Sequence, residues 1–391
     1  MDFIFKIVKM IVRRKTKILF AISNLTYGGI QTQALALAKE HKKRGARIYF
    51  FWTDRYEEDF VEKELLTNNF KIIDGRFIKD KFWSKYSWRL QRYMHIIKAS
   101  LIIRFYGIDY LVPYHNDLSN FFGAIHPYTG AKKTIFHIRN TVIEDRPKQN
   151  WHFKKAMKNQ PIIVTNSNHA KSKFKKVYGD LYDLDISTIY NGINLRKIDN
   201  SKDWKTFFEV NSFHFIVTSV ANFFAEKDYL TLFKAWQLFL ERTNSNSILL
   251  IAGDEGKKGS MELYRKEVKN LRIESNVKFL GRTSYNIELL NLADANVLST
   301  LNEGLPNVVI ETLGTGTPFI GTDVNGIREV IGENYPIPLF NVGDFSKLSD
   351  IIFFVYESKY DVSYIYNYSI KRSELFSTSN LVSNYDEIIE I

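Results

Sequence analysis

Short apolar runs alternate with amphipathic stretches along the first half of the chain. Apolar runs bounded by polar or glycine-containing turns are typical of buried strands, and apolar positions that recur every three or four residues are typical of helices. The first run ends at the turn TYGGIQ, and an amphipathic stretch follows it. Strand, glycine turn, helix and strand in this order predict a parallel α/β sheet. The predicted strands of this half lie at residues 16–25, 47–52, 108–116, 132–140 and 161–167.

The same pattern restarts after Asn191. A polar stretch, 191–205, is predicted as a linker, and an amphipathic helix at 229–242 follows the next strand. The predicted strands of this half lie at residues 213–223, 247–256, 277–283, 295–300 and 317–323. The sequence therefore predicts an α/β protein with one domain over residues 1–190, a linker over 191–210 and a second domain over 211–360.

Composition narrows the possible chemistry. The chain has no cysteine, which excludes disulfides, thiolate zinc sites and a cysteine nucleophile. Charge is unevenly distributed: residues 1–195 carry 34 Lys+Arg and 17 Asp+Glu (net +17), whereas residues 196–391 carry 20 and 26 (net −6). A basic half suits phosphates, an anionic membrane surface or nucleic acid, although ordinary solubility charge is the plainer explanation.

Two segments of the basic half combine cations with apolar or aromatic residues. Residues 3–17 are apolar and end in a basic cluster, and residues 76–98 alternate Arg and Lys with Phe, Trp and Tyr. Both fit the inner face of an anionic membrane, which predicts a cytoplasmic protein bound peripherally to the plasma membrane. A frayed terminus and a partly buried aromatic helix are the alternatives. No nucleic-acid motif accompanies them, so we expect no nucleic-acid partner.

The stretch TLNEGLPNVVIETLGTGTPFIGTD, residues 300–323, carries the most specific chemistry. Pro306 suits the first turn of a helix, whose N-terminus offers backbone N–H groups to an anion. Glu303 lies just before that helix and Glu311 two turns inside it. Carboxylates repel a phosphate but accept hydrogen bonds from hydroxyls, so the pattern fits a nucleotide sugar. The phosphates would lie on the helix, the hexose at Glu303 and the ribose at Glu311. An ordinary helix start with a solvated glutamate is the alternative.

Several segments resemble glycosyltransferase family 4 (group 1 glycosyltransferases), and they occur in the family's order. They are YGGIQTQALALAKEH, VTNSNHAKSKF, IYNGIN, SVANFFAEKDYLTLFKAW, LLIAGDEG, VKFLGRTS, the Glu-x7-Glu pair and TPFIGTDVNGIREVI. The resemblance covers about residues 17–335. It implies the GT-B fold, two Rossmann-like α/β domains facing across a cleft, with a terminal helical segment, 361–391, that packs back toward the first domain.

The resemblance also implies a donor site. Glu303 would contact the donor sugar and Glu311 the ribose, while Lys227 would face the diphosphate. The glycines of the first turn and the backbone after Glu303 would approach the phosphates, namely Gly28, Gly29, Gly304, Leu305, Asn307 and Val308. One departure concerns Asn222, which stands where the family has an arginine, and Arg282 is a candidate replacement.

A histidine is also expected near the reacting carbon. His137 matches the family histidine and would point into the cleft, with His115 as the second candidate. Arg139, two residues beyond His137, would meet an acceptor phosphate. Enzymes with this fold generally activate the donor without a metal, so the resemblance implies no metal and no other cofactor.

The resulting prediction is a retaining glycosyltransferase. It would move a hexose from a nucleotide sugar, most simply a UDP-sugar, to a glycan or polyprenyl-diphosphate-linked acceptor in bacterial surface polysaccharide or glycolipid synthesis. Richness in Lys, Ile, Asn, Phe and Tyr is typical of an AT-rich bacterial genome. A catalytically silent partner subunit remains an alternative because of Asn222, and an epimerase or phosphorylase of the same fold is another.

Overall fold

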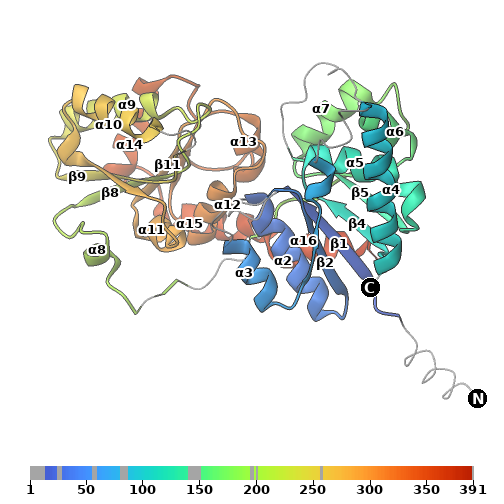
Figure 1. Cartoon of the computed structure of the whole chain (residues 1–391). Helices are drawn as coiled ribbons and strands as arrows, with labels where there is room; N and C mark the ends of the chain where they lie inside the picture. Colours follow the sequence, from blue (N-terminus) through green and yellow to red (C-terminus); the bar gives the residue numbers. More distant parts are fainter. Residues whose placement is uncertain are drawn as a thin grey trace, which may run out of the picture. The chain divides into compact units, whose positions relative to one another are not determined.

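The chain is described by a computed structural model that covers residues 14–23, 29–54, 60–79, 87–139, 151–193, 198–199, 201–255 and 259–389. It divides into two compact units (Figure 1). Unit 1 comprises Met1–Gly192 together with Thr378–Ile391, and unit 2 comprises Ile193–Ser377.

Unit 1 is built on a parallel sheet with the strand order β3-β2-β1-β4-β5-β6-β7. The strands are β1 (Lys17–Ile22), β2 (Arg47–Trp52), β3 (Lys71–Asp74), β4 (Tyr110–Pro113), β5 (Lys133–Ile138), β6 (Ile162–Thr165) and β7 (Ile186–Thr188). Residues from Ile18 to Ile22 are all buried, since helices cover both faces of a parallel sheet. This explains why the central strands are continuous apolar runs rather than alternating ones.

Helices cover the two faces of this sheet (Figure 1). Side chains of β1 such as Phe20 pack with α2 and α16 on one face, and Leu19 packs with α4 and α5 on the other. The helices of unit 1 are α2 (Gly29–Lys43), α3 (Phe60–Thr67), α4 (Trp88–Tyr106), α5 (Asn116–Thr129), α6 (Trp151–Lys158), α7 (Asn168–Tyr178) and α16 (Thr378–Asp386), with a 3-10 turn at Arg76–Lys79.

Local sequence signals fix the ends of α4, which borders the site described below. The Ser87 hydroxyl caps its first turn by accepting from the backbone N–H groups of Arg89 (3.2 Å) and Leu90 (3.5 Å). Gly107 ends the helix with φ of 60°, a left-handed conformation that favours glycine. The sequence therefore sets both ends of α4, through a serine N-cap and a C-terminal glycine.

Unit 2 has a second parallel sheet with the strand order β10-β9-β8-β11-β12. The strands are β8 (Phe215–Val220), β9 (Ser247–Ala252), β10 (Val277–Gly281), β11 (Ala295–Leu298) and β12 (Phe319–Gly321). The helices are α8 (Trp204–Phe207), α9 (Tyr229–Thr243), α10 (Ser260–Asn270), α11 (Asn286–Leu292), α12 (Asn307–Thr315), α13 (Asn325–Ile331), α14 (Phe345–Tyr356) and α15 (Val362–Ser373). Two 3-10 turns span Glu274–Asn276 and Glu374–Phe376.

The boundaries between units differ in detail from those expected from the sequence. Trp204, Phe208 and Val210 belong to the core of unit 2, so the second half of the expected linker is part of a folded unit. Of the terminal segment, α15 stays with unit 2, where the Arg372 guanidinium donates to the carbonyl oxygens of Val330 (2.9 Å) and Glu329 (2.7 Å). Residues from Thr378 onward belong to unit 1.

Among the described residues, no helix combines the length and the apolar character needed to cross a membrane.

Candidate active site

Two loops at the carboxyl edge of the unit 2 sheet are joined by backbone hydrogen bonds. The loop after β8 donates from Asp228 N to Ser299 O (3.0 Å), and the loop after β11 donates from Leu301 N to Glu226 O (2.8 Å). Lys227 thereby forms an antiparallel bridge with Thr300. Lys227 and Thr300, 73 positions apart in the chain, are thus held beside each other, at the edge where ligands of parallel sheets bind.

Lys227 and Glu303 form an ion pair at this point. Their side chains are 18% and 13% exposed, so the pair is largely shielded but still open to solvent. The two residues expected to hold the donor phosphates and the donor sugar therefore lie in contact. A ligand that carries both a phosphate and a hydroxylated group can engage both partners.

α12 begins directly after these residues. Asn307 is its first residue and Pro306 its N-cap, with no side chain capping the first turn. The N-terminus of a helix presents backbone N–H groups and the positive end of its dipole, which favour an anion. Glu303 lies in the preceding loop and the half-buried Glu311 lies in the helix, as the sequence indicated.

A second helix packs against the Glu303 loop. A Cβ atom at Gly326, in the first turn of α13, would lie 2.5 Å from the Glu303 carbonyl oxygen and 2.7 Å from that of Gly304. Only glycine permits this approach, which supports the conformation of the loop. The sequence motif TPFIGTDVNGIREVI contains Gly326, but its contact with the loop was not predicted.

Asn222 has a structural task in unit 2. Its side-chain oxygen accepts from the backbone N–H of Asp254 at 2.9 Å and so connects the loops after β8 and β9. Arg282 is exposed in the loop after β10. Of the two glycines in the first turn, Gly28 lies outside the described residues, and Gly29 is the first residue of α2.

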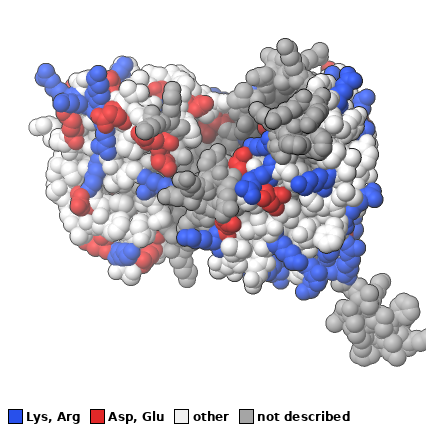
Figure 2. All heavy atoms as spheres, viewed as in Figure 1, with Lys and Arg blue, Asp and Glu red and all other residues white. Residues whose placement is uncertain are grey.

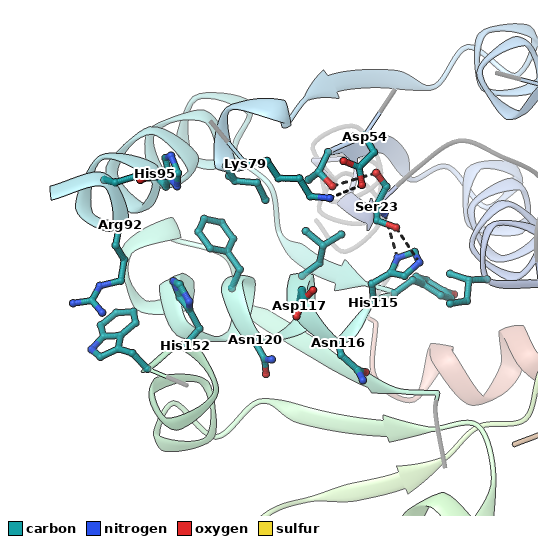
Figure 3. Close-up of a pocket in the computed structure, with 18 of the residues that line it drawn as sticks. Ser23, Asp54, Lys79, Arg92, His95, His115, Asn116, Asp117, Asn120 and His152 are labelled. Carbon is teal, nitrogen blue, oxygen red and sulfur yellow. Dashed lines mark hydrogen bonds and ion pairs between the residues drawn. The ribbon is translucent and has the colours of Figure 1, made fainter. Parts of the chain in front are cut away.

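Unit 1 contains a pocket of about 1000 Å³ (Figure 3). Residues that directly follow β1, β2, β4 and β5 line it, so it also lies at the carboxyl edge of a parallel sheet. These residues are Ser23, Thr53, Asp54, Tyr114, His115, Asn116, Asp117 and Arg139. α4 and α6 form its other wall with Trp88, Arg92, His95, Trp151 and His152.

His115 lies in the wall of this pocket, as Figure 3 shows. Its Nδ1 accepts from the backbone N–H of Ser23 at 3.2 Å, so the proton of the neutral ring is on Nε2, which lies 3.1 Å from the Ser23 hydroxyl. Burial, and then the charge of Arg139, lower the pKa of His115, while Asp117 and Asp54 act in the opposite direction. The ring is therefore a neutral, oriented hydrogen-bonding group at neutral pH.

His137 does not point into this pocket, contrary to the orientation expected from the sequence. Its ring is 1% exposed, its Nδ1 donates to the Pro113 carbonyl oxygen at 2.6 Å, and its Nε2 is paired with the Tyr385 hydroxyl of α16. Burial, and then the charge of Arg139, lower its pKa to about 3. The alternation of side chains along β5 explains this placement, because His137 faces the layer that contains α16.

Arg139 lines the pocket together with His115, so the structure brings the two expected acceptor residues together. Its guanidinium lies 4.4 Å from the centre of the Tyr114 ring and donates to the Asn191 side chain at 3.0 Å. Its buried Nε has no hydrogen-bond partner in the described part of the chain. It therefore retains a donor for a ligand.

Comparisons with known proteins identify the family of the chain. The family model of group 1 glycosyl transferases matches residues 201–372, and that of glycosyltransferase family 4 matches residues 27–197. An uncharacterised glycosyltransferase of Methanocaldococcus jannaschii is 24% identical over 290 residues, which are 70% of this chain and 68% of that protein. The N-acetyl-alpha-D-glucosaminyl L-malate synthase of Bacillus anthracis is 33% identical over 42% of this chain and 43% of its own length. An Escherichia coli UDP-Gal:alpha-D-GlcNAc-diphosphoundecaprenol alpha-1,3-galactosyltransferase is 24% identical over 59% of each chain.

Solved structures show the same architecture. A glycosyltransferase from Rickettsia africae has a TM-score of 0.79 at 19% identity and covers 96% of this chain and 98% of its own. The Anabaena protein HepE, solved with UDP and glucose, has a TM-score of 0.77 at 16% identity and covers 95% and 99%. The two sheets, each with its helices, are the two Rossmann-like α/β domains of the GT-B fold. The chain belongs to the group 1, family 4 glycosyltransferases and is a glycosyltransferase.

Sequence reasoning missed most of the pocket in unit 1. Trp88 and Arg92 were noted only as part of a basic-aromatic stretch, and the contributions of Trp151 and His152 were not foreseen. The available signal was the density of aromatic and basic residues at 88–95 and at 151–155. It did not show that the two segments lie on one pocket.

Proposed function

We propose that this glycosyltransferase transfers a hexose from a UDP-sugar to a hydroxyl of a lipid-diphosphate-linked or other glycan acceptor, with retention of anomeric configuration. The observation that carries the proposal is the Lys227–Glu303 ion pair before the N-terminus of α12, with Glu311 further along that helix. Cation and helix terminus suit a diphosphate, and the two carboxylates suit the hydroxyls at either end of it. HepE with UDP and glucose, and the galactosyltransferase named for UDP-Gal, support this donor class.

Each group has a role in the proposed transfer. The bond between the sugar anomeric carbon and the donor phosphate oxygen breaks, and the electron pair leaves with UDP. Lys227 and the α12 terminus stabilise the charge that grows on the leaving diphosphate. The acceptor hydroxyl attacks the same face and releases its proton to the departing phosphate oxygen. Glu303 orients the sugar, and His115, in place of His137, is the histidine assigned to the acceptor side.

The acceptor is assigned to unit 1 because its pocket is large and rich in polar groups. The diphosphoundecaprenol in the name of the E. coli relative is consistent with a lipid-linked acceptor. Synthesis of bacterial surface polysaccharide or glycolipid is the corresponding process. The L-malate in the name of the B. anthracis relative defines the main competing acceptor class, a small organic acid.

Membrane attachment is proposed through α4. Its apolar residues Leu90, Tyr93, Ile97, Leu101 and Phe105 are 40–84% exposed and recur every three or four positions, so they form one stripe along the helix. Arg89, Lys98 and Arg104 flank this α4 stripe. Cations beside exposed apolar residues complement anionic lipid headgroups over an apolar interior.

The chain enters unit 1 next to the end of the α4 stripe. Arg14 donates to the Gly107 carbonyl oxygen at 2.7 Å, and the Lys17 ammonium donates to that of Tyr106 at 2.6 Å. Residues 14–17 therefore lie next to the end of the α4 stripe. Figure 2 shows Lys and Arg gathered on the right and lower edge of unit 1 in that view, which favours the inner face of a plasma membrane.

A screen of sugar nucleotides by thermal shift, followed by an assay of donor turnover, tests the proposal. A ligand that binds only the folded state raises the melting temperature, so UDP and one or a few UDP-sugars should stabilise the protein. Release of UDP from the stabilising sugar nucleotide should follow. Stabilisation by UDP without turnover of any sugar nucleotide, even with lipid-linked acceptors present, would indicate a silent partner subunit. No stabilisation by UDP would contradict the donor assignment.

A further inference from the structure

One wall of the unit 1 pocket is aromatic and cationic, and it is separate from the His115 side that is assigned to the reacting hydroxyl. Arg92 of α4 lies 4.9 Å from the centre of the Trp88 ring and 4.3 Å from that of Trp151, which begins α6. In Figure 3, Arg92 and His152 lie on one side of the pocket, and Ser23 and His115 on the other. The pocket therefore has two differently equipped parts.

Arg92 is held in place by aromatic rings. Its Nε is buried and has no hydrogen-bond partner among the residues that the structure describes, and no described carboxylate is paired with it. Stacking on aromatic faces fixes the plane of a guanidinium and leaves its N–H edge available for an oxyanion. A structural arginine would normally be bonded to carbonyl or carboxylate oxygens instead.

A neighbour on the pocket wall also has an unused polar atom. The Nε2 of His152 is buried without a hydrogen-bond partner in the described part of the chain. Burial, and then the charges of Arg92 and His95, lower the pKa of His152 to about 4, so this ring is neutral near pH 7. Buried polar atoms without partners are costly, and a ligand that supplies them is the usual explanation.

We propose that Arg92, stacked between Trp88 and Trp151, binds a phosphoryl group of the acceptor, with His152 as its hydrogen-bonding neighbour. This inference rests on the proposed function only in calling the ligand an acceptor. The reacting hydroxyl would lie toward His115, and the phosphoryl group would anchor the acceptor at Arg92. A planar guanidinium offers paired N–H donors to phosphate oxygens, and the two indole rings hold its plane in place.

Binding of an anion at Arg92 can be measured without any enzymatic turnover. The probe is inorganic pyrophosphate, added with saturating UDP so that the donor site of unit 2 is occupied, and the readout is a pH titration of the His152 ring by NMR. A bound anion offsets the charge of Arg92, so pyrophosphate should raise the pKa of His152. Arg92→Gln should abolish this rise, and Arg92→Lys, which keeps the charge but not the planar stacking, should reduce it.

Arg89→Gln is the matched control. Arg89 is on the same helix and also stacks on Trp88, at 5.4 Å, but it does not line the pocket. It should leave the pyrophosphate effect unchanged. An unchanged effect in Arg92→Gln, with the fold verified by its melting curve, would overturn the proposal. If L-malate at the same concentration raised the pKa of His152 equally, the ligand of Arg92 would be a carboxylate rather than a phosphoryl group, and the proposal would be wrong.

Steady-state kinetics test whether this phosphoryl subsite contributes to glycosyl transfer. With a phosphorylated acceptor, Arg92→Gln should raise the KM by roughly 10- to 100-fold, as expected for lost hydrogen bonds to a charged group, and should change kcat little. With the same acceptor lacking phosphate, the loss should be much smaller, and equal losses on both acceptors would overturn the proposal. If the wild type turns over no sugar nucleotide, the proposed function fails while the NMR result still decides the subsite.

Discussion

The side chains of Lys227 and Glu303 are paired with each other in unit 2, although each is assigned to a different part of the donor. Bound diphosphate competes with Glu303 for the lysine, and a bound sugar hydroxyl competes with Lys227 for the carboxylate. The pair holds both side chains near the N-terminus of α12 before the donor arrives. Donor binding therefore exchanges one ion pair for two charge-assisted contacts.

Removal of the lysine should weaken binding of every ligand that carries the diphosphate. Lys227→Ala should lower the affinity for UDP and for the UDP-sugar by about 1.5–3 kcal/mol, the usual range for hydrogen bonds to charged groups. Turnover should fall further, because negative charge grows on the leaving group. Titration calorimetry measures the first effect and UDP release the second. Lys234→Ala, on the nearby helix α9, is a control in which neither should change.

The two histidines of unit 1 should respond differently to substitution. His115→Ala should reduce turnover strongly while the fold and UDP affinity persist. His137→Ala should chiefly reduce stability, by about 1–3 kcal/mol, because it leaves the Pro113 carbonyl and the Tyr385 hydroxyl without their buried partner. Chemical denaturation and a turnover assay separate the two effects. A fully stable, inactive His137→Ala variant would restore the role first expected from the sequence.

Stability should fall as the pH falls below about 6.5. Burial holds the pKa of His137 at about 3 and that of His41 at about 4 in the folded protein, against 6.5 for an ordinary histidine. Between these values the unfolded chain binds protons that the folded chain does not bind, so each histidine removes at most roughly 1.4 kcal/mol per pH unit. Denaturant midpoints from pH 7 to pH 5 measure the slope. His137→Gln should make the slope shallower, and an unchanged slope would show that other groups dominate.

The α4 stripe should control attachment to anionic vesicles. The double variant Leu101→Ser, Phe105→Ser should reduce co-sedimentation with anionic vesicles and leave the melting temperature nearly unchanged, because both side chains are mostly exposed. High salt should weaken binding of the wild type, since the Debye length falls from ~10 Å at 0.1 M to ~3 Å at 1 M. The control, Leu263→Ser on α10, removes a similarly exposed leucine of unit 2 and should have no effect. Equal binding of both variants would exclude the α4 stripe.

Much of the fold could be predicted from the sequence because buried parallel strands are continuous apolar runs. β1 and β8 are of this kind, and both were expected close to their observed bounds. β3 and β7 were missed because KIID and IST are short strands at the edges of the sheet with few apolar residues. The placement of α8 in unit 2 depends on the burial of Trp204. That burial could not be predicted because the neighbouring residues in the sequence are polar.

The donor residues could be proposed from the sequence because they lie within one short stretch. A single loop and helix contains Glu303, Pro306 and Glu311. Their separation in the sequence therefore predicts how far apart they lie in space. The acceptor pocket could not be assembled in this way, because Arg92 and Trp151 meet only through the packing of both α4 and α6 on α5. His137 was misplaced in orientation because its partner, Tyr385, is 248 positions away.

The central claim is tested most directly by comparing UDP with the UDP-sugar in two glutamate variants by titration calorimetry. Glu311→Ala should weaken both ligands by about 1.5–3 kcal/mol, because the ribose is common to both. Glu303→Ala should weaken only the UDP-sugar, with a matching loss of turnover, and should leave UDP bound as tightly or more tightly, because Glu303 no longer competes with the diphosphate for Lys227. Glu262→Ala, an exposed glutamate of α10, is the control. Equal weakening of UDP by Glu303→Ala, or unchanged UDP affinity in Glu311→Ala, would contradict the assignment of sugar and ribose to these two carboxylates.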